Sequence, residues 1–304
     1  MSDFLTTVVR ERRAYVAASR ATRPLAQVES AARRAAFGRG TVSLAAEIRR
    51  RRETGRLAVI AEVKRISPAL GPLATGLDPA ALAQRYQEAG AAAISVLVEP
   101  HHWGGSLDDL RAVEPAVRRL GWPTGEKEPA YGILPVLAKD VIVDEYQIAE
   151  AGAAGAHAVL LIAEALSDLE LHRLILYARS LGMDALVEAH DPAAFDLAVR
   201  VEEATRNVEI PDGLALGRET LLGVNARDLR EPSRLDRGTI HRLAPLAPRD
   251  PLLVAESGVT SVEDAEALPM RVDAVLVGTA LVRAADPAPL VRALAAARPG
   301  RALA

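Results

Sequence analysis

Short apolar runs recur along the chain, and each is bounded by turn residues. They are rich in Val, Ile and Leu and too short for helices. The runs are Leu57–Glu62, Ala92–Val98, Leu134–Lys139, His157–Ala163, Ala185–Glu188, Leu221–Asn225, Leu252–Glu256 and Ala274–Gly278. Because they are apolar on both faces, they predict parallel strands that are covered on both sides.

Stretches with helical periodicity separate these runs. Ser106 begins one that extends to Gly121, with Asp109 three residues on, an acidic variant of the capping box. The other predicted helices begin at Asp78, Ser167, Asp191, Ser261 and Pro287. Eight alternations of strand and helix predict an α/β fold that closes into a (β/α)8 TIM barrel. The alternative, an open doubly wound sheet, usually has fewer strands and carries a dinucleotide fingerprint that is missing here.

Residues 1–304 are predicted to form a single barrel domain, with residues 1–50 as an N-terminal helical extension. Helical patterns run from Phe4 to about Ala21 and again around Leu44–Arg52. Two connections, 121–132 and 203–218, are longer than a barrel requires. Because both precede strands, we expect surface insertions at the face away from the active site.

Composition and charge narrow the function classes. The 304 residues include no cysteine, which excludes disulfides, thiolate metal sites and cysteine nucleophiles. The net charge of −3 lacks the basic excess of a nucleic-acid binder, and the run 49–52 of four arginines predicts a solvated helix end. No apolar run approaches the ~20 residues of a membrane span, and the charged N-terminus is unlike a signal peptide, so a cytoplasmic protein is expected. The six histidines lack metal-ligand spacing, and no metal is expected.

Polar residues follow most of the predicted strands. They are Glu62, Lys64, Lys139, Glu188, Asn225, Arg227, Glu256, Ser257, Gly258, Gly278 and Thr279. In this fold the active site lies at the carboxyl ends of the strands. Glu and Lys are costly to bury unless they are paired, so the pattern favours a site for general acid and base chemistry. The alternative is a set of ion pairs that tie the rim together, but charges without function would appear at both strand ends.

Two dipeptides and one loop indicate how a substrate is held. Ser257-Gly258 and Gly278-Thr279 follow the seventh and eighth strands, the usual phosphate-binding position of these barrels. The first loop, 65–76, contains prolines and glycines and predicts a lid that closes over substrate. The alternative is a merely irregular connection.

Seven segments together resemble the indole-3-glycerol-phosphate synthase family, in order and at compatible spacing from about residue 4 to 295. They are IAEVKRISP (60–68), ISVLVEPHHWGGSLDDL (94–110), PVLAKDVIVDEYQIAEAGAAGAHAVLLI (135–162), LGMDALVEAHD (181–191), LLGVNARDL (221–229), VAESGV (254–259) and VLVGTALVRAADP (275–287). Neighbouring phosphate-binding barrels share parts of this set, but not the whole.

The resemblance implies an enzyme that closes an indole ring in tryptophan biosynthesis. Its phosphorylated small-molecule substrate is 1-(2-carboxyphenylamino)-1-deoxyribulose 5-phosphate, and the products are indole-3-glycerol phosphate, CO2 and water. It also implies that no cofactor is used, and it leaves an association with other tryptophan-pathway enzymes open. From the charge and hydropathy above, no nucleic-acid or membrane partner is expected.

The resemblance also assigns roles to the residues at the strand ends. Lys139 is implied as the general acid at the ribulose carbonyl or its hydroxyl, Glu188 as the base in dehydration and Lys64 as a second acid. Glu62, Asn225 and Glu256 are implied to hold the sugar hydroxyls and the charged lysines. Ser67 and Arg227 are implied to bind the carboxylate of the substrate. The residues implied to bind the phosphate are Ser257, Gly258, Gly278 and Thr279. Those implied to form the walls around the aromatic ring are Trp103, Leu160, Ile162 and Leu229.

The chain departs from the family pattern at four places. Val141 stands where an aromatic residue is usual, Ala226 where a second Asn is common and His157 where Asp is usual, and the loop at 101–106 reads HHWGGS. None removes a predicted proton donor or base, but they leave open a paralogue that acts on a substituted anthranilate-derived substrate. A non-catalytic phosphate-binding partner subunit and an aldose–ketose phosphate isomerase are further alternatives.

Overall fold

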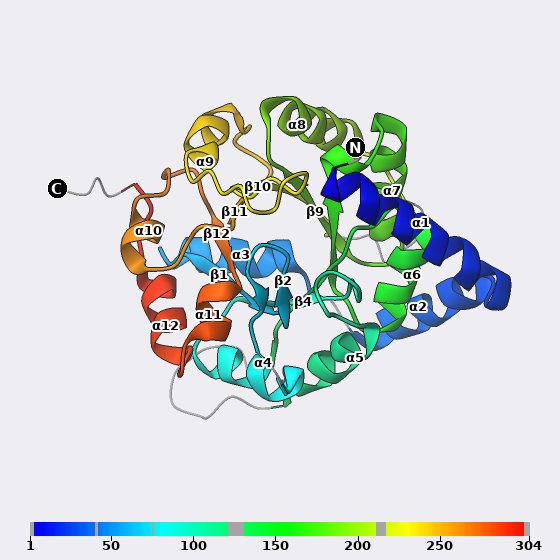
Figure 1. The fold of residues 1–304 in the computed structure, drawn as a ribbon, viewed down its shortest axis with the longest axis horizontal. Helices are drawn as coiled ribbons and strands as arrows, with labels where there is room; N and C mark the ends of the chain where they lie inside the picture. The colour runs from blue at the N-terminus through cyan, green and yellow to red at the C-terminus, as the bar shows by residue number, and fades with distance from the viewer. Residues whose placement is uncertain (1–2, 40–41, 75, 121–130, 211–216, 301–304) are drawn as a thin grey trace.

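Eight parallel strands close into a barrel (Figure 1) in a computed structural model that describes residues 3–39, 42–74, 76–120, 131–210 and 217–300. The barrel strands are β1 (Ala58–Val63), β4 (Ala93–Leu97), β7 (Val136–Lys139), β8 (Ala158–Ile162), β9 (Asp184–Ala189), β10 (Thr220–Asn225), β11 (Leu253–Glu256) and β12 (Ala274–Val277). Closure is complete because β1 pairs with both β12 and β4, so that Ile60 lies opposite Leu276 on one side and Ala93 on the other. This confirms the predicted TIM barrel and excludes the open sheet.

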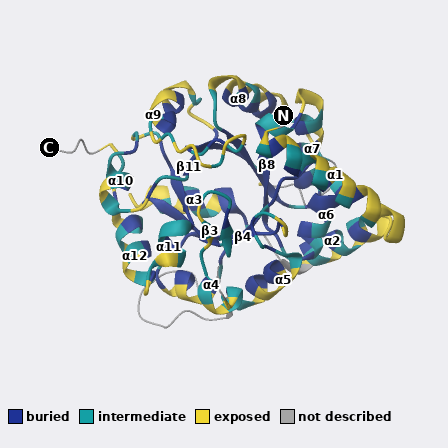
Figure 2. Ribbon diagram, in the orientation of Figure 1, coloured by how far each residue is buried: buried dark blue, intermediate teal, exposed yellow. Residues whose placement is uncertain are grey.

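Strand alternation divides the buried side chains into an inner and an outer layer. In β1, Ala58 and Ile60 belong to the cluster inside the barrel, whereas Val59 and Ala61 pack outward against the helices. The strands are buried throughout (Figure 2) because both faces are covered. The last inward position of a strand therefore opens into the mouth of the barrel, which we define as the end formed by the carboxyl ends of the strands.

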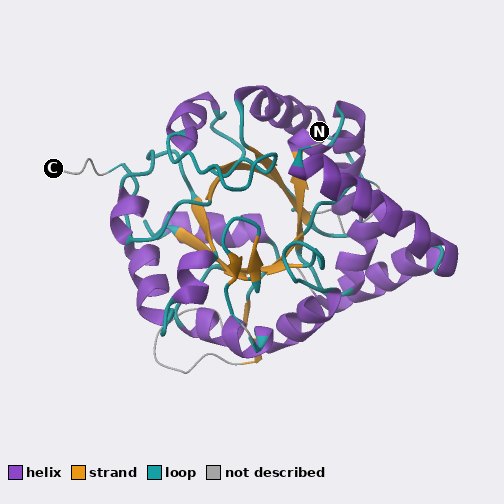
Figure 3. Ribbon diagram, in the orientation of Figure 1, coloured by secondary structure: helices purple, strands orange, loops and turns teal. Residues whose placement is uncertain are grey.

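Helices surround the strands in an outer ring (Figure 3). After the N-terminal helices these are α4 (Pro79–Glu88), α5 (Leu107–Ala116), α6 (Glu145–Ala153), α7 (Asp168–Ser180), α8 (Pro192–Arg206), α9 (Thr239–Leu243), α10 (Val262–Glu266), α11 (Thr279–Arg283) and α12 (Ala288–Ala296). The starts of α4, α5, α7, α8 and α10 match the predicted caps: the Asp78 side chain accepts from Ala80 N and Ala81 N, and Ser167 forms a capping box with Glu170. The starts of α6, α9 and α11 were not predicted. A short 3-10 helix, η1 (Ala163–Ala165), follows β8, and another, η3 (Ala244–Leu246), follows α9.

Three N-terminal helices pack on the barrel: α1 (Phe4–Thr22), α2 (Leu25–Arg39) and α3 (Leu44–Glu53). The expected helices α1 and α3 are present, and α2 was not predicted. Leu44 and Ile48 of α3 join the inner cluster at the end of the barrel opposite the mouth, beside Asp184 at the start of β9. At the other end Phe4 N donates to Arg230 O, so α1 begins at the mouth and runs across η1 and α6.

Some boundaries differ from the prediction. The helix after Ser106 ends at Ala116, not Gly121, and Pro115, which cannot donate to the carbonyl of the preceding turn, weakens its last turn. The chain then forms β5 (Arg118–Leu120), which pairs with β6 (Tyr131–Ile133). The predicted insertion 121–132 lies mostly outside the described residues, and so does 211–216 of the second one, whose first residues belong to α8.

The predicted lid contains a small hairpin, β2 (Ile66–Ser67) paired with β3 (Gly71–Pro72). Within the described residues, no helix is both long and apolar enough to cross a bilayer.

Candidate active site

The inward positions at the ends of five strands place polar side chains in the mouth. Glu62 follows Ile60, Lys139 follows Leu137 and Glu188 follows Leu186, each two residues on and therefore on the same face. By the same alternation Asn225 ends β10 and Glu256 ends β11. Ile60, Leu137 and Leu186 are buried in the inner cluster. The polar residue two positions later therefore lies directly above the apolar core of the barrel.

One cavity of about 430 Å³ collects all of these side chains. Every residue predicted for the site lines it: Glu62, Lys64, Ser67, Trp103, Lys139, Leu160, Ile162, Glu188, Asn225, Arg227, Leu229, Glu256, Ser257, Gly258, Gly278 and Thr279. Lys64, Lys139 and Glu188 thus share a cavity with the loops after β11 and β12. Charged residues that only formed ion pairs around the barrel would not all converge on one cavity. The geometry therefore favours an active site over a set of structural ion pairs.

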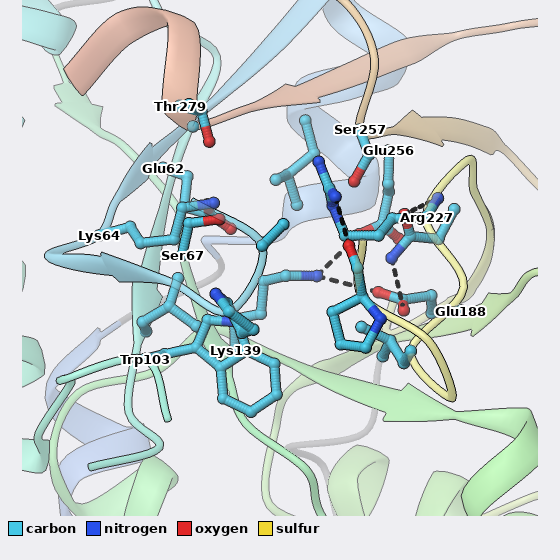
Figure 4. Close-up of a pocket in the computed structure, with 18 of the residues that line it drawn as sticks. Glu62, Lys64, Ser67, Trp103, Lys139, Glu188, Arg227, Glu256, Ser257 and Thr279 are labelled. Carbon is cyan, nitrogen blue, oxygen red and sulfur yellow. Dashed lines mark hydrogen bonds and ion pairs between the residues drawn. The ribbon is translucent and has the colours of Figure 1, made fainter. Parts of the chain in front are cut away.

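Lys139 stands between two carboxylates. Its Nζ lies 2.9 Å from Glu188 Oε2 and 2.8 Å from Glu256 Oε2 (Figure 4). Both glutamates are almost fully buried, at 1% and 2% exposed. Burial of a charged carboxylate is tolerated when a cation and hydrogen bonds compensate it.

This cluster shifts the pKa values of its members. Burial by itself would lower the pKa of Lys139, but Glu188, Glu256 and Glu62 outweigh it, so the pKa is raised and the ammonium form is favoured. Burial would raise the pKa of Glu188, but Lys139 and a 2.8 Å hydrogen bond from Asn225 Nδ2 hold it below its usual value. Burial raises the pKa of Glu256 to about 8; Lys139 opposes this shift and Glu188 adds to it. One carboxylate therefore stays ionised while its neighbour retains a proton up to about neutral pH.

A second ion pair lies on the opposite side of the cavity (Figure 4). Lys64 Nζ is 2.5 Å from Glu62 Oε1. Gly278 makes room for this pair, because a Cβ at that position would lie 2.1 Å from Glu62 Oε1. Gly223 does the same for Glu256, whose Oε1 would lie 2.4 Å from its Cβ. Two glycines on barrel strands or their ends are therefore required by the carboxylates beside them, not by their backbone angles.

Arg227 is held at the edge of the cavity by its own loop. Its backbone N–H donates to Asn225 Oδ1 at 2.9 Å, and its Nη1 donates to Pro232 O at 2.6 Å. Burial lowers the pKa of Arg227, but a guanidinium stays charged at any physiological pH. The remaining N–H groups of the guanidinium can bind an anion such as a carboxylate bidentately.

The loops after β11 and β12 present backbone to the cavity. Ser257 has a φ of 64°, the one non-glycine residue with a positive φ among the described residues, and Gly258 follows with a φ of 84°. Backbone N–H groups in a tight turn of this kind can form a concave anion-binding nest. Thr279 lies on the same side of the cavity as Lys64 (Figure 4), and a Cβ on Gly278 would lie 3.1 Å from Lys64 Nζ.

Apolar side chains form the remaining wall. Leu160 and Ile162 of β8 are buried and line the cavity, and Leu229 lines it from the loop after β10. Trp103 packs edge-on against Phe4 of α1, with ring centroids 5.7 Å apart. Such a flat, rigid surface suits an aromatic ring.

Several lining residues were not predicted. Glu99 follows β4 as the predicted residues follow their strands, and the same argument would have found it. Its carboxylate accepts from the backbone N–H groups of His101, His102 and Trp103 and so fixes the tryptophan. Other lining residues, among them Pro232, Leu235 and Leu276, carry no chemical signal in the sequence.

The four departures from the family pattern differ in whether they line the cavity. Val141 is buried and lines the cavity, and Trp103 of the HHWGGS loop lines it as well. His157 lies away from the cavity, at the start of β8, where its Nδ1 accepts from Val136 N. Ala226 is buried but is not among the lining residues. Only the changes at 141 and in the loop reach the substrate space.

Solved structures share the barrel at low sequence identity. A 3-hexulose-6-phosphate synthase from Salmonella typhimurium matches with a TM-score of 0.55 at 16% identity, over 79% of this chain and 97% of that one. A tryptophan synthase from M. tuberculosis matches with a TM-score of 0.53 at 16% identity, over 84% and 98%. These similarities support the fold alone.

Sequence relatives are much closer. A protein named indole-3-glycerol phosphate synthase from Nocardioides is 48% identical over 77% of this chain and 78% of its own length. Indole-3-glycerol phosphate synthase 2 from Streptomyces coelicolor is 41% identical over 97% and 99%. The model of the family described as indole-3-glycerol phosphate synthase matches residues 5–294. With its barrel, its cavity and these relatives, the chain belongs to the indole-3-glycerol phosphate synthase family.

Proposed function

We propose that this chain closes the indole ring of indole-3-glycerol phosphate with Lys139 as the general acid and Glu188 as the general base. The reaction is the family's activity in tryptophan biosynthesis, a carboxy-lyase reaction on 1-(2-carboxyphenylamino)-1-deoxyribulose 5-phosphate. The observation that carries the assignment is the position of Lys139 between two buried carboxylates in the cavity.

The proposed first step joins a ring carbon to the ribulose chain. The aryl carbon that bears the carboxylate attacks the ribulose carbonyl, and Lys139 donates a proton to the carbonyl oxygen as its C–O double bond becomes a single bond. Substrate placed beside Lys139 would displace its contacts with Glu188 and Glu256, which stabilise its protonated form. The lysine would then become a stronger acid at the moment of reaction.

Two losses complete the ring. The C–C bond to the carboxylate breaks, its electrons restore the aromatic ring, and neutral CO2 departs. A cavity walled by Leu160, Ile162 and Trp103 solvates the carboxylate poorly, which favours this loss. Solvent reprotonates Lys139 after the first step, and the hydroxyl formed there then leaves as water with a proton from Lys139. Glu188 accepts the proton that the five-membered ring releases and can return it to Lys139, 2.9 Å away. Glu188 suits this role because it is held ionised by Lys139 and Asn225.

The remaining residues would bind the two ends of the substrate. Arg227 and Ser67 suit the carboxylate, and the nest at Ser257-Gly258, with Gly278-Thr279, suits the phosphate. Glu256 Oε1 has no hydrogen-bond partner among the described residues, so it is free to form a hydrogen bond with a sugar hydroxyl. A cytoplasmic location and an association with other enzymes of the tryptophan pathway stay predictions from the sequence.

Formation of indole fluorescence from the unsubstituted substrate tests the activity, and Lys139→Ala tests the role of the lysine. The variant is expected to lower kcat by at least about a hundredfold, the lower range for general acid catalysis. Arg49→Ala is a suitable control, because it removes an ion pair with Glu219 at the other end of the barrel. Near-normal turnover by Lys139→Ala would refute the assigned role, and substrate binding without turnover by the parent protein would refute the activity.

A further inference from the structure

We infer that Arg12, on the N-terminal helix α1, is a positioning residue for Lys139, because it forms a buried ion pair with Asp140, the next residue in the chain. The inference rests on the proposed function, since it takes Lys139 as the general acid. It gives the helical extension a part in the reaction rather than in stability alone.

The ion pair is short and almost fully buried. Arg12 Nη2 lies 2.5 Å from Asp140 Oδ2, and both side chains are 5% exposed. Arg12 also lies over the ring of Tyr15, 4.4 Å from its centroid, which fixes the guanidinium from the α1 side. Because breaking a buried pair leaves an uncompensated charge, the two side chains restrain each other strongly.

Asp140 passes this restraint to the chain directly after Lys139. Its Oδ1 accepts from Val141 N at 2.8 Å, and Gln147 Nε2 donates to Asp140 Oδ2 at 3.3 Å and to Val141 O at 2.9 Å. The carboxylate thus joins α1, the turn after β7 and helix α6. A shift of Asp140 would move the backbone on which Lys139 is mounted.

Close packing alone does not hold this turn. A second cavity of about 160 Å³, which we call the side cavity, lies under α1 and is lined by Arg12, Tyr15, Gln147 and Glu150. Asp140 lines both the side cavity and the active-site cavity, so the ion pair forms part of the wall between them. With empty space on one side, the position of Asp140 depends on its bonds, and Arg12 supplies the one full countercharge among them.

The electrostatics agree with this dependence. Burial raises the pKa of Asp140, and the charge and hydrogen bond of Arg12 are the largest influences that oppose the shift. The other nearby acid, Glu150, faces Tyr15, whose hydroxyl donates to it at 2.9 Å. Without Arg12, Asp140 would gain a proton or turn toward the side cavity, and either change would loosen the end of β7.

The test compares Arg12→Met with Arg13→Met on the same helix. Arg13 makes an exposed ion pair with Glu170 at 3.0 Å, far from Lys139, and is a matched control. Arg12→Met is expected to lower kcat and kcat/KM together by at least about tenfold, with KM within about threefold of the parent, because displacement of a reacting group by about 1 Å is costly. Arg13→Met is expected to leave both unchanged, and Arg12→Lys, which keeps the charge, is expected to recover part of the loss.

A merely structural ion pair would lower the melting temperature of Arg12→Met and leave its kcat within twofold of the parent, and that result would overturn the inference. Asp140→Asn provides a second reading that is also available if Arg12→Met does not fold. Its kcat is expected to fall as well, with a shift of the alkaline limb of the pH profile of kcat. In the double variant the two losses are expected not to multiply, since both break one interaction; independent losses would contradict the proposal. Lys139→Ala is run in parallel: full activity in that variant would refute the proposed function, whereas an inactive Lys139→Ala beside a normal Arg12→Met would refute only the role of Arg12.

Discussion

Glu62 occupies the space in which a side chain at position 278 would lie. A Cβ on Gly278 would be 2.1 Å from Glu62 Oε1 and 3.1 Å from Lys64 Nζ. The φ of Gly278 is −119°, which any residue can adopt, so the requirement for glycine comes from the ion pair and not from the backbone. Gly278, directly after β12, thus leaves room for the Glu62–Lys64 ion pair at the end of the neighbouring strand β1.

Gly278→Ala is therefore expected to displace Glu62 and Lys64 and to lower kcat/KM by at least about tenfold while the barrel stays folded. Activity and the melting temperature are measured together. Gly152→Ala in α6 is the control, because its Cβ would also meet close neighbours, Ala32 and Met183, but far from the cavity. Equal activity losses in both variants would show that the effect is general and not due to the ion pair.

The sequence predicted the barrel well because each strand carries its own signal. Both faces of a barrel strand are buried, so runs such as Leu134–Lys139 are apolar throughout. The polar residue that ends each run then identified the mouth. The helix α2 was missed because most of its apolar residues are alanines, which mark a buried face weakly, and its one aromatic residue, Phe37, is exposed.

What the sequence did not predict depends on contacts between distant segments. Arg12 and Asp140 are 128 positions apart. The spacing of Val8 and Val16 puts Arg12 on the buried face of α1, but no local pattern identifies its partner. Leu235 reaches the cavity because the loop after β10 folds back, as its bridge to Arg227 shows. Such tertiary contacts follow from the closed fold and have no local periodicity.

The raised pKa of Glu256 predicts a change in the pH profile of activity. Its pKa of about 8 means that it is largely protonated below that pH and becomes ionised as the pH rises through it. The new negative charge beside Lys139 would make the lysine a weaker acid in the free enzyme, so kcat/KM is expected to fall as pH rises through about 8. Glu256→Gln cannot ionise and is expected to lose this limb, although its activity at the optimum is lower. The same limb in both proteins would assign it to another group.

Arg227→Ala is expected to raise KM by roughly ten- to a hundredfold, as loss of a charge-assisted contact to the substrate carboxylate would. The decisive comparison uses an analogue that lacks the carboxylate on its aryl ring. Parent and variant are expected to bind this analogue equally, because the contact is absent in both. If the variant binds the analogue as poorly as the substrate, Arg227 acts on another part of the molecule or on the shape of its loop.

Glu164 predicts a pH dependence of stability. It lies in η1, where its Oε1 accepts from His190 N at 2.7 Å, and burial raises its pKa to about 7, an effect that this hydrogen bond opposes. In an unfolded chain the pKa is about 4.3. The folded protein therefore binds the proton more tightly, and the stability from this group is fully present below about pH 4.3 and is lost as pH rises through about 7.

Glu164→Gln removes this loss, since the amide oxygen can accept the same hydrogen bond without a charge. The melting temperature of the variant relative to the parent is expected to rise between pH 5 and pH 8, by a few degrees if the difference is on the order of 1 to 2 kcal/mol. Glu170→Gln is a control of opposite sign. Hydrogen bonds from Ser167 hold the pKa of Glu170 below its usual value, so that variant is expected to lose stability relative to the parent above about pH 4. A constant difference between Glu164→Gln and the parent at every pH would mean that Glu164 does not titrate in this range in the folded protein.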